Sequence, residues 1–211
     1  MRDGFEDVRK RLEDERKKQR INPKIGLLPT GHFYYWPQFP ELKRMGMRMY
    51  RRLIDLLKNE VDIVTPDLVD TPKKSESAGE IFKKENIDMV LIYPLGYTPS
   101  MNIVPAIRNL DVPIRILNAH EDSSYDYEKA DTAIYLHHEG VCCIPEYAGA
   151  LVNLGKKFRV RTGYFDDKRL MEELRADFKG AAAARFFKNM NIGLIGEVYT
   201  CLLYTSPSPR D

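Results

Sequence analysis

The stretch Met89-Val-Leu-Ile-Tyr93 is an unbroken apolar run, and Lys24-Ile-Gly-Leu-Leu28 earlier in the chain is a second run of the same kind. Continuous rather than alternating apolar character is typical of strands that are buried on both faces of a parallel sheet. Residues 62–65 and 114–117 are shorter segments of this type, and residues 157–162 alternate like a more exposed strand. Together these segments predict the strands of one mostly parallel sheet.

Helical patterns separate the predicted strands. Residues 40–59 carry apolar side chains at helical spacing, and Thr71-Pro72 begins a second helix that runs to about residue 85. Further helices are expected over residues 99–110, 139–154 and 167–187, with Gly155 closing the second of these. Strands that alternate with helices predict an α/β fold: a doubly wound, three-layer sheet of the flavodoxin or Rossmann type.

Ligands of such sheets bind at the carboxyl ends of the strands. The loop after the first strand, Thr30-Gly-His-Phe-Tyr-Tyr-Trp-Pro-Gln-Phe-Pro40, is dense in aromatic side chains. Aromatic faces suit the C–H faces of sugars, and Gln38 offers a donor and an acceptor to hydroxyl groups. The alternative is that these rings cover the top of the core or a subunit interface. Gly31 lacks the glycine spacing of a dinucleotide-binding loop.

The segment His137-His138-Glu139-Gly-Val-Cys-Cys-Ile-Pro-Glu146 collects three types of metal-ligating residue. Adjacent histidines diverge on a helix or a strand, and adjacent cysteines lack the two-residue gap of a zinc knuckle, so the spacing argues against a metal site. We expect a loop that supplies polar hydrogen bonds and leads into a helix. His120-Glu121-Asp122, after the fourth predicted strand, is interpreted as a solvated turn.

Composition excludes several classes of protein. The 211 residues include 33 basic and 31 acidic side chains, a formal charge of +2, which gives no case for binding nucleic acid or an anionic membrane. No apolar run approaches the roughly 20 residues of a membrane span. Three cysteines are too few for a disulfide framework in a chain of this length, so we expect a cytoplasmic protein.

The two ends of the chain differ from its centre. Residues 1–22 predict a charged helix. Residues 201–211 back-translate to a nucleotide string that resembles a sequencing-library adapter, and the alternative is a native polar tail. We therefore expect the biological part to stop near Thr200, in mid-protein. Asn191-Ile-Gly-Leu-Ile195 echoes the first predicted strand. It is either the start of a second, truncated α/β domain over residues 191–200 or the last strand of a single sheet.

Four strings, taken in order, resemble the L-arabinose/L-fucose isomerase family, in particular its arabinose-isomerase-like branch. They are Lys24-Ile-Gly with Tyr35-Trp-Pro-Gln-Phe39; Leu68-Val-Asp-Thr-Pro72; Gly140 with Pro145-Glu146; and Asn191-Ile-Gly-Leu-Ile-Gly196 with Tyr199. The resemblance covers about residues 24–200. It implies that residues 23–190 form the N-terminal domain of a larger aldose–ketose isomerase, and that the fragment alone is inactive.

The resemblance also implies a mechanism and a site. Such enzymes use Mn²⁺ and a carboxylate pair to move a proton between neighbouring carbons through an enediol. The resemblance implies that the metal ligands and these carboxylates lie downstream of this chain. The resemblance implies a homo-oligomer in which each sugar site lies between two subunits. The loop after the first strand and the Gly140–Glu146 region would contact the sugar held by the neighbouring subunit. The implied sugar-binding residues are Tyr35, Trp36, Gln38, His138, Glu139 and Glu146. The rival interpretation is a stand-alone flavodoxin-like or periplasmic-type sugar-binding module.

Overall fold

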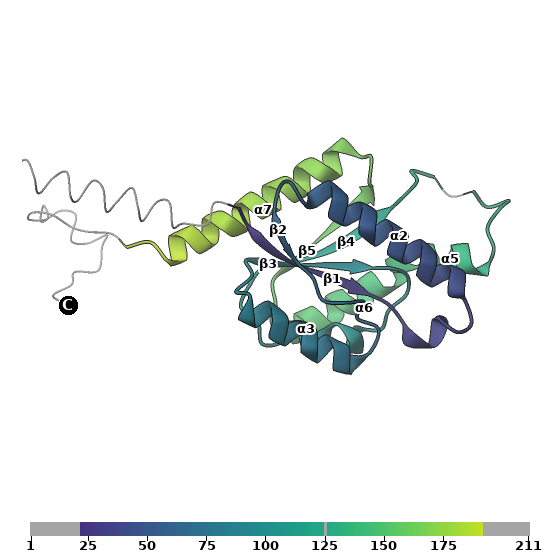
Figure 1. Ribbon diagram of the computed structural model, residues 1–211, viewed down its shortest axis with the longest axis horizontal. Coiled ribbons are helices and arrows are strands. Elements are labelled where there is room, and N and C mark those ends of the chain that lie inside the picture. Colours follow the sequence, from purple (N-terminus) through teal and green to yellow (C-terminus); the bar gives the residue numbers. More distant parts are fainter. Residues whose placement is uncertain (1–21, 125, 192–211) are drawn as a thin grey trace, which may run out of the picture.

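Figure 1 shows a computed structural model of the chain, which describes residues 22–124 and 126–191. In these residues, parallel strands form a sheet in the order β2-β1-β3-β4-β5. The strands are β1 (Lys24–Thr30), β2 (Asp62–Val64), β3 (Met89–Pro94), β4 (Ile114–His120) and β5 (Phe158–Tyr164). This order is that of a doubly wound sheet of the flavodoxin type, so the predicted fold class is confirmed.

Helices cover both faces of the sheet (Figure 1). On one face, α2 (Pro40–Leu57) and α7 (Lys168–Lys188) bury apolar side chains such as Leu53 and Leu174 against the sheet. On the other face, α3 (Pro72–Lys84), α4 (Val104–Ile107) and α6 (Gly140–Asn153) contribute Phe82 and Tyr147, among others. Each fully buried Leu, Ile or Phe contributes about 1.5–3 kcal/mol relative to an exposed one, so these two cores hold the layers together.

The central strands owe their position to their composition. Every residue of β3 is buried, and in β1 only Lys24 is partly exposed. Their side chains alternate between the two cores: Leu91 packs toward α2 and α7, while Val90 and Ile92 pack toward the opposite helices. β5 lies at the edge of the sheet and is more exposed, as its alternating sequence predicts.

The segment 99–110 is not the continuous helix that its sequence predicts. It contains the short 3₁₀ turn η2 (Ser100–Asn102) and the single-turn α4. Pro105 has no N–H and would disrupt a longer helix. The Asn102 side chain also turns inward, donating to the backbone oxygens of Gly31 at 3.1 Å and Asp70 at 3.0 Å.

The predicted helix over residues 139–154 is preceded by a helix that the sequence did not predict. α5 (Thr132–His138) begins at Asp131, whose carboxylate accepts a hydrogen bond from the Ile134 N–H at 2.8 Å, and it packs against α2. Histidines 137 and 138 therefore lie on a helix rather than in a loop, which corrects that expectation. Gly155 closes α6 as predicted, with φ of +65°. Three predicted segments lie outside the described residues. They are the charged helix over residues 1–22, apart from Asn22, the strand after Asn191, and the adapter-like tail over residues 201–211.

Candidate functional site

The loop after β1 lies at the carboxyl edge of the sheet and is held by the neighbouring loops. The Gly31 N–H donates to the Val69 oxygen at 3.0 Å, and the Trp36 indole N–H donates to the buried carboxylate of Asp70 at 2.8 Å. The Trp36 ring packs against Gly31 so closely that a Cβ at this glycine would overlap it. The sequence Thr30–Trp36 thus forms the 3₁₀ turn η1 (Phe33–Tyr35) with its backbone fixed.

An aromatic cluster lies on this fixed loop. The His32 ring centroid lies 4.9 Å from that of Tyr35 and 6.2 Å from that of Tyr97, and the two tyrosine rings are 6.5 Å apart. The Tyr97 hydroxyl donates to the Glu146 carboxylate at 3.3 Å, and the Ser100 N–H donates to the same carboxylate at 2.6 Å. Glu146 therefore ties α6 to the segment after β3, which carries Tyr97 of the aromatic cluster.

Three histidines form a second cluster beside the first. His120 ends β4, and its ring centroid lies 4.9 Å from that of His138. His137 and His138 are 5.4 Å apart but have different partners, because His137 Nδ1 lies 3.2 Å from the Leu95 backbone oxygen. The two rings meet edge to face, so the expectation that adjacent histidines diverge is not confirmed. The interpretation of His120 as part of a solvated turn is wrong, since this residue is half-buried at the end of a strand.

A pocket of about 390 Å³ opens at the histidine cluster. It collects hydrogen-bonding and aromatic side chains from the end of β4, the loop that follows, α5 and the start of α6. Its lining residues of those types are His120, Asp122, Ser123, Ser124, Tyr127, Tyr135, His138 and Glu139. Such a combination of hydroxyl, imidazole and carboxylate groups can bind a polyol through several hydrogen bonds at once.

Burial sets the protonation of this region. Burial lowers the pKa of His137 to about 4, and it also lowers the pKa values of His32, His120 and His138. The imidazoles are therefore neutral at neutral pH, and each can donate and accept a hydrogen bond. Burial, helped by the nearby charge of Glu139, raises the pKa of Tyr35, so this phenol keeps its proton.

The carboxylate of Glu146 and the thiol of Cys143, both on α6, have separate roles. Burial acts to raise the pKa of Glu146, but hydrogen bonds from Ser100 and Tyr97 outweigh it, and the pKa is lowered. Burial raises the pKa of the Cys143 thiol to about 11, so this cysteine is an inert core residue. Hydrogen bonding and orientation of a neutral, hydroxyl-rich ligand are the chemistry that these groups support.

The structure brings four of the six sequence-predicted residues to this edge as a group. His138 and Glu139 line the pocket, Tyr35 lies in the aromatic cluster within the electrostatic influence of Glu139, and Glu146 binds Tyr97. The other two have local partners: Trp36 packs against the core, and the exposed Gln38 donates to the Tyr34 backbone oxygen at 2.8 Å.

Sequence reasoning missed His120, Tyr97 and Tyr135. His120 and Tyr97 follow predicted strands, where folds of this class place ligand-binding residues. Their position in the sequence could therefore have marked them as candidates. Tyr135 lies on α5, a helix that the sequence did not predict. No sequence signal identified it.

The described residues do not form a metal centre. Across residues 22–124 and 126–191, no three His, Cys, Asp or Glu side chains are grouped so that they could hold a metal ion. These residues alone therefore do not supply a site for the Mn²⁺ that the resemblance implies.

Comparisons with known proteins give no family for this chain. A search of known protein families finds none that matches, and a search of curated proteins finds no significant relative. In the described part of the chain, no helix has the length and apolar character that a membrane span requires.

Proposed function

We propose that this chain is the N-terminal, sugar-contacting domain of an aldose–ketose isomerase of the L-arabinose/L-fucose type. The observation that carries the proposal is the convergence, at one edge of the sheet, of the aromatic loop with the His138–Glu139 pocket. The resemblance in sequence points to this edge, and the polar and aromatic groups gathered there suit a free sugar.

In this proposal the domain binds and orients the sugar. Neutral imidazoles and the Glu139 carboxylate pair with hydroxyl groups, and the rings of Tyr35 and Tyr97 lie against the sugar's C–H face. Proton transfer and metal binding belong to residues beyond this domain. The edge would complete the site of a neighbouring subunit in a cytoplasmic homo-oligomer.

The decisive experiment begins with the uninterrupted reading frame. We expect the frame to continue past Thr200 and to encode acidic and imidazole side chains that can bind a divalent ion. The protein encoded by that frame, supplied with Mn²⁺, should interconvert L-arabinose or L-fucose with the corresponding ketose. A frame that stops at Asp211, or an encoded protein that isomerises neither sugar, would contradict the proposal.

Variants then test the edge itself in that protein. Glu139→Gln and Tyr97→Ala should raise KM about tenfold with a smaller effect on kcat, because the first removes a charged acceptor for a sugar hydroxyl and the second removes a ring that lies against the sugar's C–H face. Glu172→Gln, on the exposed side of α7, is the matched control and should leave both constants unchanged. Unchanged KM in both site variants would exclude this edge as the sugar-contacting surface.

One observation favours the rival function, a stand-alone sugar-binding module. The pocket of about 390 Å³ falls within the size range of small-molecule sites and suits a small sugar. Calorimetric titration of the 211-residue chain with L-arabinose, L-fucose and flavin mononucleotide separates the two functions. Tight, saturable binding of a sugar favours the module, whereas weak binding of all three favours the isomerase domain.

A further inference from the structure

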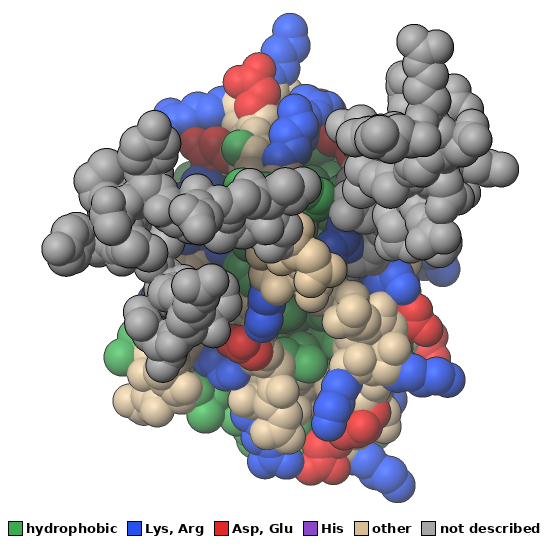
Figure 2. All heavy atoms as spheres, turned by 90° about the vertical axis from the view of Figure 1, so that its left-hand side faces the viewer, with side chains coloured by type: hydrophobic (Ala, Val, Ile, Leu, Met, Phe, Trp, Pro, Cys, Tyr) green, Lys and Arg blue, Asp and Glu red, His purple; other side chains and the backbone are tan. Residues whose placement is uncertain are grey.

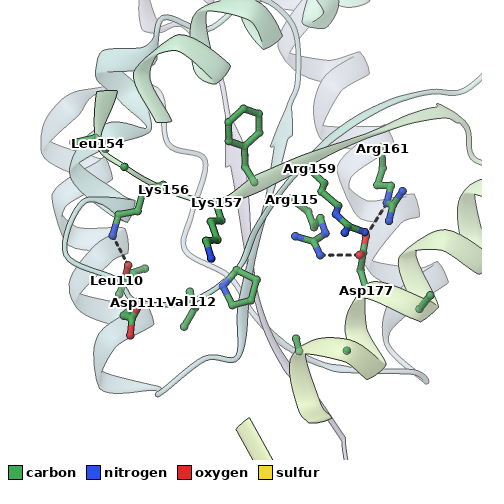
Figure 3. A pocket seen from close by; sticks show the side chains of 16 residues that line it. Leu110, Asp111, Val112, Arg115, Leu154, Lys156, Lys157, Arg159, Arg161 and Asp177 are labelled. Atoms are coloured by element: carbon green, nitrogen blue, oxygen red, sulfur yellow. Dashed lines mark hydrogen bonds and ion pairs between the residues drawn. The ribbon is translucent and has the colours of Figure 1, made fainter. Parts of the chain in front are cut away.

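A second, larger pocket lies at the opposite edge of the sheet. It has a volume of about 810 Å³ and opens where β4 and β5 begin, beside the second half of α7 (Figure 3). Figure 2 views the molecule from this side, where Lys and Arg side chains are spread over the described surface. Nothing in the proposed sugar-binding function uses this pocket.

The exposed edge strand supplies most of its positive charge. Lys157 precedes β5, and Arg159 and Arg161 follow at alternate positions, so all three project to the face that α7 covers. Arg115 on β4 lies opposite Arg159 in the strand register. Three guanidinium groups and one ammonium group thus lie on a single face of two neighbouring strands.

Acidic side chains balance only part of this charge. Asp177, only 5% exposed, forms ion pairs with Arg115 at 2.8 Å and with Arg161 at 2.7 Å, and Glu173 pairs with Arg161 at 3.1 Å. Asp111 pairs with Lys188 at 3.3 Å. Five cationic and two acidic side chains line the pocket, which leaves an excess of three positive charges.

Two of the cations are placed to meet a ligand. In Figure 3, Lys157 projects into the space between Lys156 and the Arg115–Asp177–Arg161 ion pairs, and Arg159 lies beside those ion pairs. Lys156 itself donates to the Leu110 oxygen at 2.6 Å. Lys157 and Arg159 are exposed residues, so an incoming anion can reach them. The partly enclosed walls strengthen their attraction for an anion relative to a flat surface.

Small residues on α7 create the space. Ala176, Gly180 and Ala181 line the pocket, and a Cβ added at Gly180 would meet no atom within 4 Å. Pro113 and Ala181 add apolar surface to the walls of the pocket. A ligand here would meet cations on one side and apolar surface on the other.

We propose that this groove binds a phosphorylated small molecule. Its phosphate oxygens accept hydrogen bonds from the Arg159 guanidinium, which can engage two oxygens at once, and from the Lys157 ammonium. A phosphate dianion matches the excess positive charge better than a single carboxylate does. The organic part rests against Pro113 and Ala181. This inference is independent of the proposed isomerase function, because it concerns the opposite edge of the sheet.

The test is an NMR titration of the 211-residue chain with D-ribose 5-phosphate, inorganic phosphate and D-ribose at about 0.15 M salt. We expect saturable shifts of the arginine Nε–Hε signals and of the Phe158 amide with D-ribose 5-phosphate. Inorganic phosphate should shift the arginine signals more weakly, and D-ribose should shift none of them. Equal affinity for both phosphates would exclude the apolar contact, and shifts that do not saturate would exclude the site.

The variant Lys157→Gln/Arg159→Gln provides the second arm. Since both side chains are exposed, the fold should survive, and the affinity for D-ribose 5-phosphate should fall at least about tenfold. The control Arg51→Gln/Lys73→Gln removes the same charge from exposed positions on α2 and α3 and should bind normally. Unchanged affinity in the first variant would overturn the proposal. So would sedimentation showing that these two residues hold a second copy of the chain instead.

Discussion

The two edges of the sheet differ in how their charges are arranged. The carboxyl edge holds all four histidines of the sequence, and burial keeps them neutral beside tyrosines and carboxylates. The amino edge holds a groove with a net excess of positive charge, in which guanidinium groups share one buried aspartate. One sheet therefore has an end whose histidines are neutral and an end with an excess of positive charge, so the two proposals concern ligands of different chemistry.

The largest expected effect comes from breaking the amino edge at Asp177. Replacing it with alanine leaves Arg115, only 14% exposed, and Arg161 without their buried counter-ion. Removing one partner of a buried ion pair costs about 3–5 kcal/mol, and we expect a loss of that order in the free energy of unfolding. Urea denaturation followed by circular dichroism measures it.

Asp111→Ala is the matched control, because its fully exposed carboxylate pairs only with a surface lysine at this edge. That change should alter the stability by less than about 0.5 kcal/mol. Equal losses in the two variants would show that burial of Asp177 does not decide the stability of this edge.

A pH titration of stability tests the carboxyl edge. The pKa of His137 in the folded protein, lowered by burial to about 4, lies below its value of 6.5 in the unfolded chain. The unfolded state therefore binds more protons between these two values. The stabilising effect is complete above pH 6.5 and is lost as the pH falls toward 4, by about 3 kcal/mol in total.

The variant His137→Gln should flatten this acid limb of the stability curve. Part of the slope should remain, because the pKa values of His120 and His138 are also lowered. The facing groups His120, His138 and Arg48 all disfavour a proton on His137, whereas the hydrogen bond with Leu95 favours one. Thermal unfolding at a series of pH values gives both curves, and parallel curves for the two proteins would contradict the prediction.

A smaller effect is expected in the aromatic loop. A Cβ at Gly31 would overlap the Trp36 ring, so Gly31→Ala should shift the indole away from its hydrogen bond with Asp70. Overpacking of this kind costs about 1–3 kcal/mol. Trp36 is the only tryptophan, so its fluorescence reports directly on the loop during urea unfolding.

Gly149→Ala is the control for this change, since nothing lies within 4 Å of its Cβ position on α6. We expect its fluorescence spectrum to match that of the unchanged protein. If Gly31→Ala also left the spectrum and the stability unaltered, the loop would not be fixed as the structure indicates.

How far the sequence could predict these two edges depends on the range of the interactions. Buried strands such as Met89–Pro94 are visible because every residue is apolar, and Gly155 is visible because its left-handed conformation favours glycine. Asp177 was not predictable: within a helix rich in charge it resembles any surface acid, and only the register of β4 and β5 brings Arg115 and Arg161 to it. His120 and Tyr97 could be located by their strands but not assigned a partner.

The smallest expected effect comes from adding a methyl group at the rim of the basic groove. Gly180 lies within α7 and borders the basic groove, where an added methyl group meets no other atom. Because glycine costs a helix interior about 0.5–1 kcal/mol relative to alanine, Gly180→Ala should stabilise the protein by that amount. The same methyl group narrows the groove only slightly, so affinity for D-ribose 5-phosphate should stay within about twofold. Urea denaturation measures the change in stability. If Gly180→Ala were less stable than the unchanged protein, the space beside Gly180 would not be open as the structure indicates.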